Sequence, residues 1–231
     1  VTYDFVIPDT REGWCDSTKQ LINSFLQPGQ PKPRLIYDKI RAKGTPIRGF
    51  GGICSGPDPL IRFHQQIEEF MEMYATLPWY DSVLLKTDIA NCTGCCVVAG
   101  NVRRSAELCA GEIDDILDLK DYEKYPYRED HGWMSNNSAL LSKDEDFERL
   151  GELAVKIINN GEPGYINVRN LPFGRIGKEM GELRFDRAIA FNPCQIADSK
   201  LLTPTGIRRL GNINVGDQIW SECGWTTVVK K

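Results

Sequence analysis

The sequence contains little histidine, no long apolar run and no strong excess of either charge. Its 231 residues include two histidines, His64 and His131. No stretch approaches the roughly 18 consecutive apolar residues that a membrane helix needs. The formal net charge is −4, from 28 Lys and Arg against 32 Asp and Glu. Such a balance gives no general attraction to nucleic acid or to an anionic membrane. We therefore expect a cytoplasmic protein that binds neither.

Several catalytic and metal-binding motifs are also missing. The chain contains neither G-x-S-x-G nor H-E-x-x-H, and two histidines leave little room for a Ser-His-Asp arrangement. The segment CTGCC at 92–96 lacks the second Cys or His pair that would complete a zinc site. Without a secretory signal at the N-terminus, reduced thiols are favoured over disulfides. We expect no metal site and interpret these cysteines as helix thiols, with a redox role as the alternative.

Apolar periodicity predicts alternating strands and helices through most of residues 33–193. Helices are expected at 16–26, 59–77, 82–99 and 144–160. Strands are expected at 34–40, 133–141 and 165–170, and a loop that runs into a strand is expected within 101–111. Gly161 should end the last helix, whose buried side is expected to carry Phe147, Leu150, Ala154, Ile157 and Ile158. His64 is expected to pack on its helix, and the acidic segment 112–130 to form a solvated helix and loop. The alternation is typical of a largely parallel α/β sheet or barrel.

The residue pattern of the sequence changes after residue 193. Short β-branched runs are separated there by the turn sequences PTG, VGD and CGW, which predicts small β-hairpins. Residues 194–231 also carry five Lys or Arg against three Asp or Glu, whereas the whole chain is acidic. We therefore place a domain boundary between residues 193 and 194.

Two polar segments are candidates for ligand contacts. Arg103 and Arg104 are adjacent in a loop, and their guanidinium groups repel unless an anion or carboxylates compensate them. The segment SNNS, Ser135 to Ser138, puts four hydrogen-bonding side chains on an otherwise apolar strand. If buried, these side chains need partners. They line either a polar cavity or a satisfied structural network. The Gly-rich segment GFGGICSG matches no phosphate-binding pattern.

Ordered segments of the chain resemble one enzyme family. They are DTREGW, IRAKGTPIRGFGGICSGPDPL, VVAGNVRRSAEL, WMSNNS, NGEPGYIN and NPC. Over residues 3–193 the sequence resembles class II ribonucleotide reductase, most like the monomeric ribonucleoside-triphosphate type. The resemblance implies part of a ten-stranded α/β barrel and thiyl-radical chemistry started by adenosylcobalamin. It also implies a ribonucleotide substrate, a nucleotide effector, and thioredoxin or a similar dithiol as reductant.

The same resemblance implies roles for individual residues. Asn192 matches a residue that contacts the substrate ribose, and Cys194 falls at the place of the radical cysteine. Residues Ser135, Asn136, Asn137 and Ser138 match a strand that lines the substrate cavity, and Gly100, Asn101, Arg103 and Arg104 match the effector specificity loop. The chain departs from the family directly after Cys194, where Gln195 and Ile196 replace Gly-Glu. The redox cysteine pair is not matched, so we expect this chain alone not to reduce nucleotides.

The departure coincides with a second resemblance. Residues 194–231 resemble the N-terminal splicing block of an intein, a small all-β fragment of a Hint domain. That resemblance makes Cys194 the nucleophile that attacks the carbonyl of Pro193, and we favour this role for it. No histidine follows His131, so splicing is expected to need the C-terminal half of the intein and reductase as a partner. The alternatives are a split-intein precursor whose own activity is self-processing, and a noncatalytic nucleotide-binding remnant.

Overall fold

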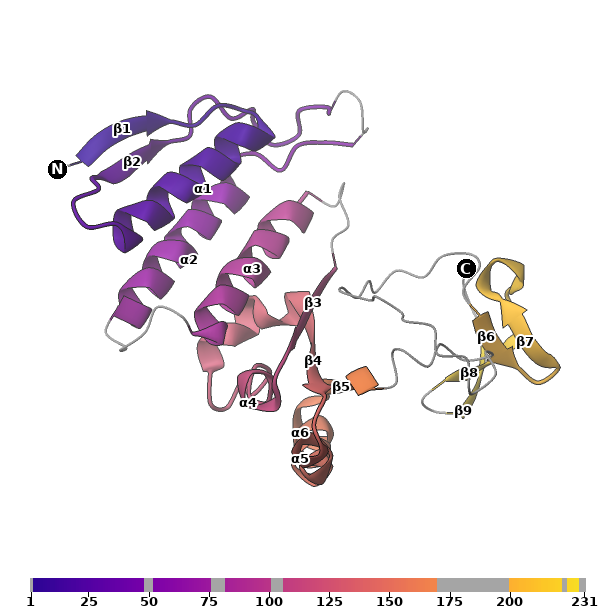
Figure 1. The fold of residues 1–231 in the computed structure, drawn as a ribbon. Helices are drawn as coiled ribbons and strands as arrows, with labels where there is room; N and C mark the ends of the chain where they lie inside the picture. Colours follow the sequence, from indigo (N-terminus) through magenta and orange to yellow (C-terminus); the bar gives the residue numbers. More distant parts are fainter. Residues whose placement is uncertain are drawn as a thin grey trace. The chain divides into compact units, whose positions relative to one another are not determined.

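The structure is a computed structural model that describes residues 2–47, 52–75, 82–100, 106–169, 200–221 and 224–228. The chain divides into two compact units. The first comprises residues 1–139 and 149–164, and the second comprises residues 140–148 and 165–231. Figure 1 shows the elements of both units along the chain. None of the helices in the described ranges combines the length and apolar character that a membrane crossing requires.

The first unit opens with a β-α-β arrangement. Strand β1 (Thr2–Val6) pairs in parallel with β2 (Lys32–Ile36), and helix α1 (Arg11–Leu26) connects the two. A parallel pair cannot be joined by a tight turn, so the intervening residues form a crossover helix. Figure 1 shows α1 beside this strand pair. The sequence predicts the helix and the second strand of this arrangement, whereas β1 was not predicted.

Helix α1 begins earlier than the sequence predicts. Thr10 is its N-cap, and the Thr10 side chain accepts a hydrogen bond from the backbone N–H of Gly13 at 3.0 Å. A Cβ on Gly13 would lie 2.6 Å from the carbonyl oxygen of Pro8, so only glycine fits there. The glycine beside Trp14 therefore belongs to the first helical turn, and the expected start at Asp16 was wrong.

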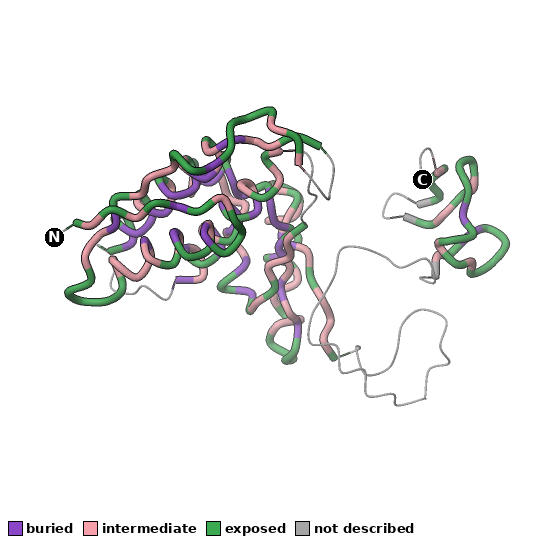
Figure 2. Tube along the Cα trace, turned by 90° about the horizontal axis from the view of Figure 1, so that it is seen from above, coloured by how far each residue is buried: buried purple, intermediate pink, exposed green. Residues whose placement is uncertain are grey.

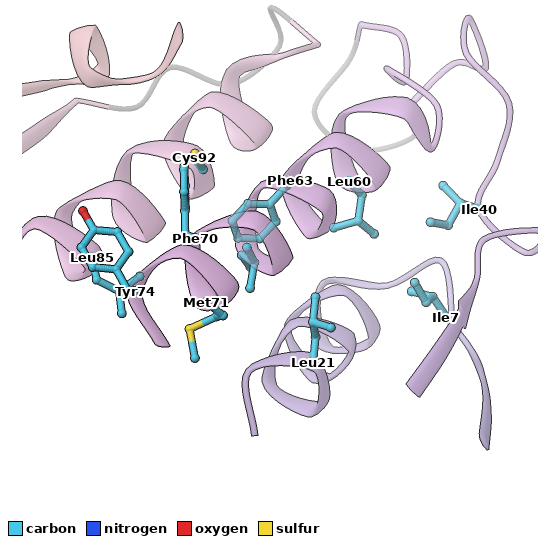
Figure 3. Packing of buried hydrophobic residues seen from close by; sticks show 11 residues of the cluster. Ile7, Leu21, Ile40, Leu60, Phe63, Phe70, Met71, Tyr74, Leu85 and Cys92 are labelled. Carbon is cyan, nitrogen blue, oxygen red and sulfur yellow. The ribbon is translucent and has the colours of Figure 1, made fainter. Parts of the chain in front are cut away.

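Three helices form the core of the first unit. Helices α2 (Asp58–Ala75) and α3 (Val83–Val98) confirm the two predicted there, and they lie side by side with α1 (Figure 1). Ser82 caps α3 by accepting a hydrogen bond from the N–H of Leu85 at 3.1 Å. Figure 3 shows the buried side chains gathered between these helices. The cluster comprises Ile7, Leu21, Ile40, Leu60, Phe63, Ile67, Phe70, Met71, Tyr74, Leu85 and Cys92.

A second sheet follows α3. Strand β3 (Glu107–Gly111) pairs in parallel with β4 (Ser135–Leu141), and β5 (Gly164–Asn167) completes a sheet of order β3-β4-β5. The link between β3 and β4 contains three short helices. They are α4 (Ile113–Ile116), η1 (Pro126–Asp130) and η2 (Gly132–Met134). This acidic segment is helix and loop as expected, but its Arg128 is fully buried rather than solvated.

The helix expected at 144–160 is divided into two. Helix α5 (Asp144–Glu148) is followed by α6 (Leu150–Asn160), which ends at Gly161 with φ 75°, the left-handed conformation that glycine favours. The expected buried side was wrong. Leu153 is the buried residue of α6, whereas Ile158 is 82% exposed.

The second unit contains the two hairpins expected after residue 193. Strands β6 (Lys200–Thr203) and β7 (Gly206–Arg209) pair antiparallel, as do β8 (Gln218–Ser221) and β9 (Gly224–Thr227). The short helix η4 (Leu210–Asn212) follows β7. Figure 2 shows these hairpins as largely exposed or intermediate, while buried positions concentrate in the helices of the first unit. The described strands form these small sheets, and the ten-stranded barrel stays a prediction.

Candidate functional site

The four polar residues of strand β4 divide between its two faces. Ser135 and Asn137 are buried, whereas Asn136 is exposed and Ser138 is half-buried. Successive side chains of a strand point to opposite sides, so the motif presents two residues inward and two outward. The sequence left open whether the four line a polar cavity or form a satisfied structural network, and the structure separates them into two pairs.

The inward pair belongs to a satisfied network. The Ser135 hydroxyl donates to Asn137 Oδ1 at 2.9 Å. The backbone N–H and the side-chain amide of Asn137 both donate to Glu162 Oε2, at 3.1 and 2.9 Å. Burial raises the pKa of Glu162, while Lys120, whose Nζ lies 3.9 Å from Oε2, acts in the opposite direction. Glu162 was missed as a site residue by sequence reasoning, although it lies in the quoted segment NGEPGYIN.

The outward pair lies next to the start of strand β5. A Cβ added to Gly164 would lie 3.1 Å from the hydroxyl oxygen of Ser138, so glycine lets the backbone approach that hydroxyl closely. Segments 135–138 and 161–164, distant in sequence, are thereby brought together at one place. Asn136 and Ser138 keep side-chain polar groups on the more open face.

A cavity of about 430 Å³ lies between the start of α1 and the end of α3. Its lining includes Gly100, the described residue of the expected effector loop. It also includes Asp9 and Arg41, which form an ion pair, and Arg11. Cavities of this size suit small-molecule ligands. The sequence analysis identified Gly100 but not the charged residues, because they come from segments far from Gly100 in the chain.

A second cavity, of about 440 Å³, lies between α1, α2 and α3. Its wall is mostly apolar and includes Trp14, Ile22, Phe63 and Val97, with Lys19 as its charged residue. Such a lining offers few groups that could orient a polar ligand, so this cavity is the weaker candidate for a nucleotide.

A buried ionic network around Asp88 holds the segment that precedes β4. Asp88 of α3 is fully buried, and one of its oxygens accepts hydrogen bonds from Arg128 and from His131, the latter at 2.7 Å. The other oxygen accepts from Tyr74 at 3.2 Å and Tyr127 at 3.3 Å. A buried charge requires such partners. The network fixes η1 and η2, which lead directly into the motif of β4, and sequence reasoning did not find it.

His64 is a packed core histidine, as predicted. Its Nε2 lies 3.1 Å from the Thr18 hydroxyl and 3.3 Å from that of Ser17, and both hydroxyls donate to the carbonyl of Trp14. They are therefore left to accept, which places the proton on Nε2. Nδ1 then accepts from the Tyr37 hydroxyl at 2.8 Å. Burial lowers the pKa of His64 to about 4, so the ring is neutral at pH 7.

The cysteines of α3 fit the interpretation as helix thiols. Burial raises the pKa of Cys92 and Cys95, and it raises the pKa of Cys96 to about 11. Thiols with raised pKa values stay protonated at neutral pH and are poor nucleophiles. Within the described ranges, no group of three or more His, Cys, Asp or Glu residues is arranged to hold a metal ion.

The remaining predicted site residues lie outside the described residues. They are Asn101, Arg103, Arg104, Asn192 and Cys194. The structure thus brings Ser135 to Ser138 together with Glu162 and places Gly100 at a cavity, while the roles expected for the other five stay predictions.

Comparison with known proteins supplies an independent result. The family model of the insertion domain of B12-dependent ribonucleotide reductase matches residues 2–71. A crystal structure of a B12-dependent (class II) ribonucleotide reductase matches 76% of this chain with a TM-score of 0.62 and 34% identity. The chain covers 24% of that structure. The larger part of this chain is therefore similar to a segment of a class II, B12-dependent ribonucleotide reductase.

The relatives found by sequence comparison are ribonucleoside-triphosphate reductases. The adenosylcobalamin-dependent ribonucleoside-triphosphate reductase of Euglena gracilis is 41% identical over 197 residues, which is 84% of this chain and 26% of the relative. The reductase of the same name from Lacticaseibacillus paracasei is 37% identical over 81% of this chain and 25% of its own length. This chain spans about a quarter of the length of these relatives. The segment is thus similar to the triphosphate-reducing members of the class.

Proposed function

We propose that residues 1–193 are part of the catalytic barrel of an adenosylcobalamin-dependent ribonucleotide reductase. The complete enzyme would reduce ribonucleoside triphosphates by thiyl-radical chemistry in the cytoplasm, with thioredoxin or a similar dithiol as reductant. The observation that carries this proposal is the 41% identity to the Euglena gracilis reductase over 84% of the chain. Reduced thiols persist in the cytoplasm, which suits a dithiol-dependent reaction.

Two groups of described residues support a proposal of nucleotide binding. Asn136 and Ser138 supply amide and hydroxyl groups on the open face of β4, suited to hydrogen bonds with a substrate ribose or phosphate. The cavity of about 430 Å³ combines Gly100 of the expected specificity loop with Arg11 and Arg41, and it supports a role in binding the anionic effector. We assign substrate binding to the first group and effector binding to the second.

The cofactor does not fit the described cavities. Both have volumes near 440 Å³ and suit small organic ligands, whereas a corrinoid with its adenosyl and nucleotide arms is larger. We therefore assign no residue of the described ranges to adenosylcobalamin, and the proposal of this cofactor depends on the names of the relatives.

The test of the reductase proposal uses the enzyme assembled with its remaining segments. Purified full-length product should convert CTP to dCTP when adenosylcobalamin and a dithiol are present, and omission of either should abolish conversion. Replacing Asn192 by Ala should lower the rate, because the proposed ribose contact is lost. Conversion that is unchanged without the cobalamin would contradict the assignment.

A second function is proposed for residues 194–231, namely that of the N-terminal part of an intein. In its first step the Cys194 thiol attacks the carbonyl carbon of Pro193. A thioester forms, the Pro193-Cys194 amide breaks, and the released amino group takes up the proton. The support is the pair of antiparallel hairpins that the described part of this segment contains.

Thiol cleavage tests the intein proposal on the chain itself. Incubation with a small thiol should release a fragment that ends at Pro193 and carries the thiol as a thioester, detectable by intact mass. A Cys194→Ala variant should release nothing, whereas Cys223→Ala should cleave like the parent. Addition of the matching C-terminal half should give a ligated product. Equal release from the Cys194→Ala variant would rule out this chemistry.

A further inference from the structure

The side chain of Glu162 accepts a hydrogen bond from the backbone in the middle of β4. Asn137 pairs with Cys109 of β3 on one side of the sheet. Its backbone N–H donates to the side chain of Glu162. The next residue, Pro163, has no N–H to offer, and β5 begins only at Gly164. The carboxylate therefore holds the middle of β4 from a residue that precedes β5 in the chain.

The network has a fixed direction. An ionised carboxylate only accepts hydrogen bonds, so the amide nitrogen of Asn137, and not its oxygen, must face Glu162. The Asn137 oxygen then faces Ser135, whose hydroxyl donates to it at 2.9 Å. The chain of donors runs from Ser135 through Asn137 to Glu162, and it holds both inward side chains in one orientation.

Fixing the inward pair also determines the outward pair. The side-chain period of a strand is two, so a residue held inward directs its neighbours to the other face. Asn136 and Ser138 are the more exposed members of the motif. We propose that Glu162 is a positioning residue, whose carboxylate holds Ser135 and Asn137 inward so that Asn136 and Ser138 are presented to a bound nucleotide.

The identity of this ligand rests on the proposed reductase function, whereas the positioning role rests on the contacts alone. The charged and titratable neighbours of Glu162 are few. Lys120 lies 3.9 Å from its oxygen, and Tyr122 interacts with it electrostatically. Because burial raises the pKa of Glu162, this side chain should ionise at a higher pH than an ordinary glutamate.

Nuclear magnetic resonance of the 231-residue chain tests the proposal. The backbone amide proton of Asn137 should shift with pH with a midpoint above 4.5, and Glu162→Gln should abolish that shift while the amide still exchanges slowly. In Glu162→Ala the Asn137 amide should exchange about tenfold faster or more, because a bond to a charged acceptor is lost. Glu123→Gln alters an exposed carboxylate and should change neither result.

Other variants separate positioning from ligand contact. Ser135→Ala should shift the Asn137 side-chain amide, whereas Asn136→Ala and Ser138→Ala should leave the Asn137 titration unchanged. A titration that persists in Glu162→Gln, or unchanged exchange in Glu162→Ala, would overturn the positioning role. If Glu162→Ala does not fold, the Glu162→Gln titration decides.

Addition of CTP tests the ligand. Shifts at Asn136 and Ser138 that disappear in Glu162→Ala support the whole proposal, and shifts confined to Ser135 and Asn137 overturn it. If CTP moves no resonance while Asn137 titrates as expected, the positioning role is supported and the proposed nucleotide site of this chain is contradicted. Failure of the inference is thereby distinguishable from failure of the proposed function.

Discussion

Acidification from pH 7 to pH 5 should destabilise the first unit through His64. This histidine is 2% exposed, and burial lowers its pKa from 6.5 to about 4. Between these two pKa values, His64 is protonated in the unfolded chain but neutral in the folded chain. Above about pH 6.5 His64 is neutral in both states and costs no stability. As the pH falls from 6.5 toward 4, protonation of the unfolded chain lowers the free energy of unfolding. Between pH 7 and pH 5 the difference in proton uptake amounts to about 2 kcal/mol of unfolding free energy.

Urea unfolding followed by the helical circular dichroism signal measures this effect. Other groups also titrate, so the informative quantity is the difference between the parent and His64→Gln, which cannot titrate at this position. The variant should lose about 2 kcal/mol less than the parent between pH 7 and pH 5. Tyr37→Phe keeps the imidazole buried, so it should lower stability at pH 7 but retain the pH dependence. Equal pH dependence in the parent and His64→Gln would refute the reasoning.

Three further substitutions test the packing. Asp88→Ala should cost about 3–5 kcal/mol of unfolding free energy, because Arg128 would be left buried without its carboxylate. Denaturant unfolding measures this loss, and a loss below about 1 kcal/mol would contradict a buried ion pair. Gly94→Ala should destabilise by about 1–3 kcal/mol despite its better helix propensity. Its new Cβ would lie 2.2 Å from Glu107 Oε1, and an unchanged melting temperature would contradict this. Ile158→Lys should stay within about 0.5 kcal/mol of the parent in the same unfolding assay, because this side chain is 82% exposed, and a larger loss would show that α6 is covered.

Local sequence patterns predicted the helices that carry a clear apolar stripe. Helix α2 was expected because its apolar residues recur at helical spacing, and Ile67, Phe70, Met71 and Tyr74 of that stripe are buried. The start of α1 was missed because glycine is a poor helix former, whereas here Gly13 lies in the first helical turn and packs against Pro8. The apolar side of α6 satisfied the same spacing rule, but periodicity cannot tell a covered face from one that is left open.

The candidate site was predictable only as far as neighbours in sequence determine it. Four consecutive polar residues on an apolar strand singled out β4. The partner that orients them, Glu162, lies 25 residues beyond Asn137, and no local pattern signals that pairing. Arg128 was missed for the same reason: in an acidic segment a solvated arginine is the ordinary expectation, and its carboxylate partner lies 40 residues earlier.

The hydrogen bonds of Asp88 have a consequence for how the first unit folds. Its four partners lie 14, 39, 40 and 43 residues away along the chain, on α2 and on the segment before β4. None of these contacts forms until distant stretches have come together, and closing such loops is entropically costly. The helical layer and the entry to β4 should therefore unfold as one cooperative block, with similar amide exchange rates in α3 and η2.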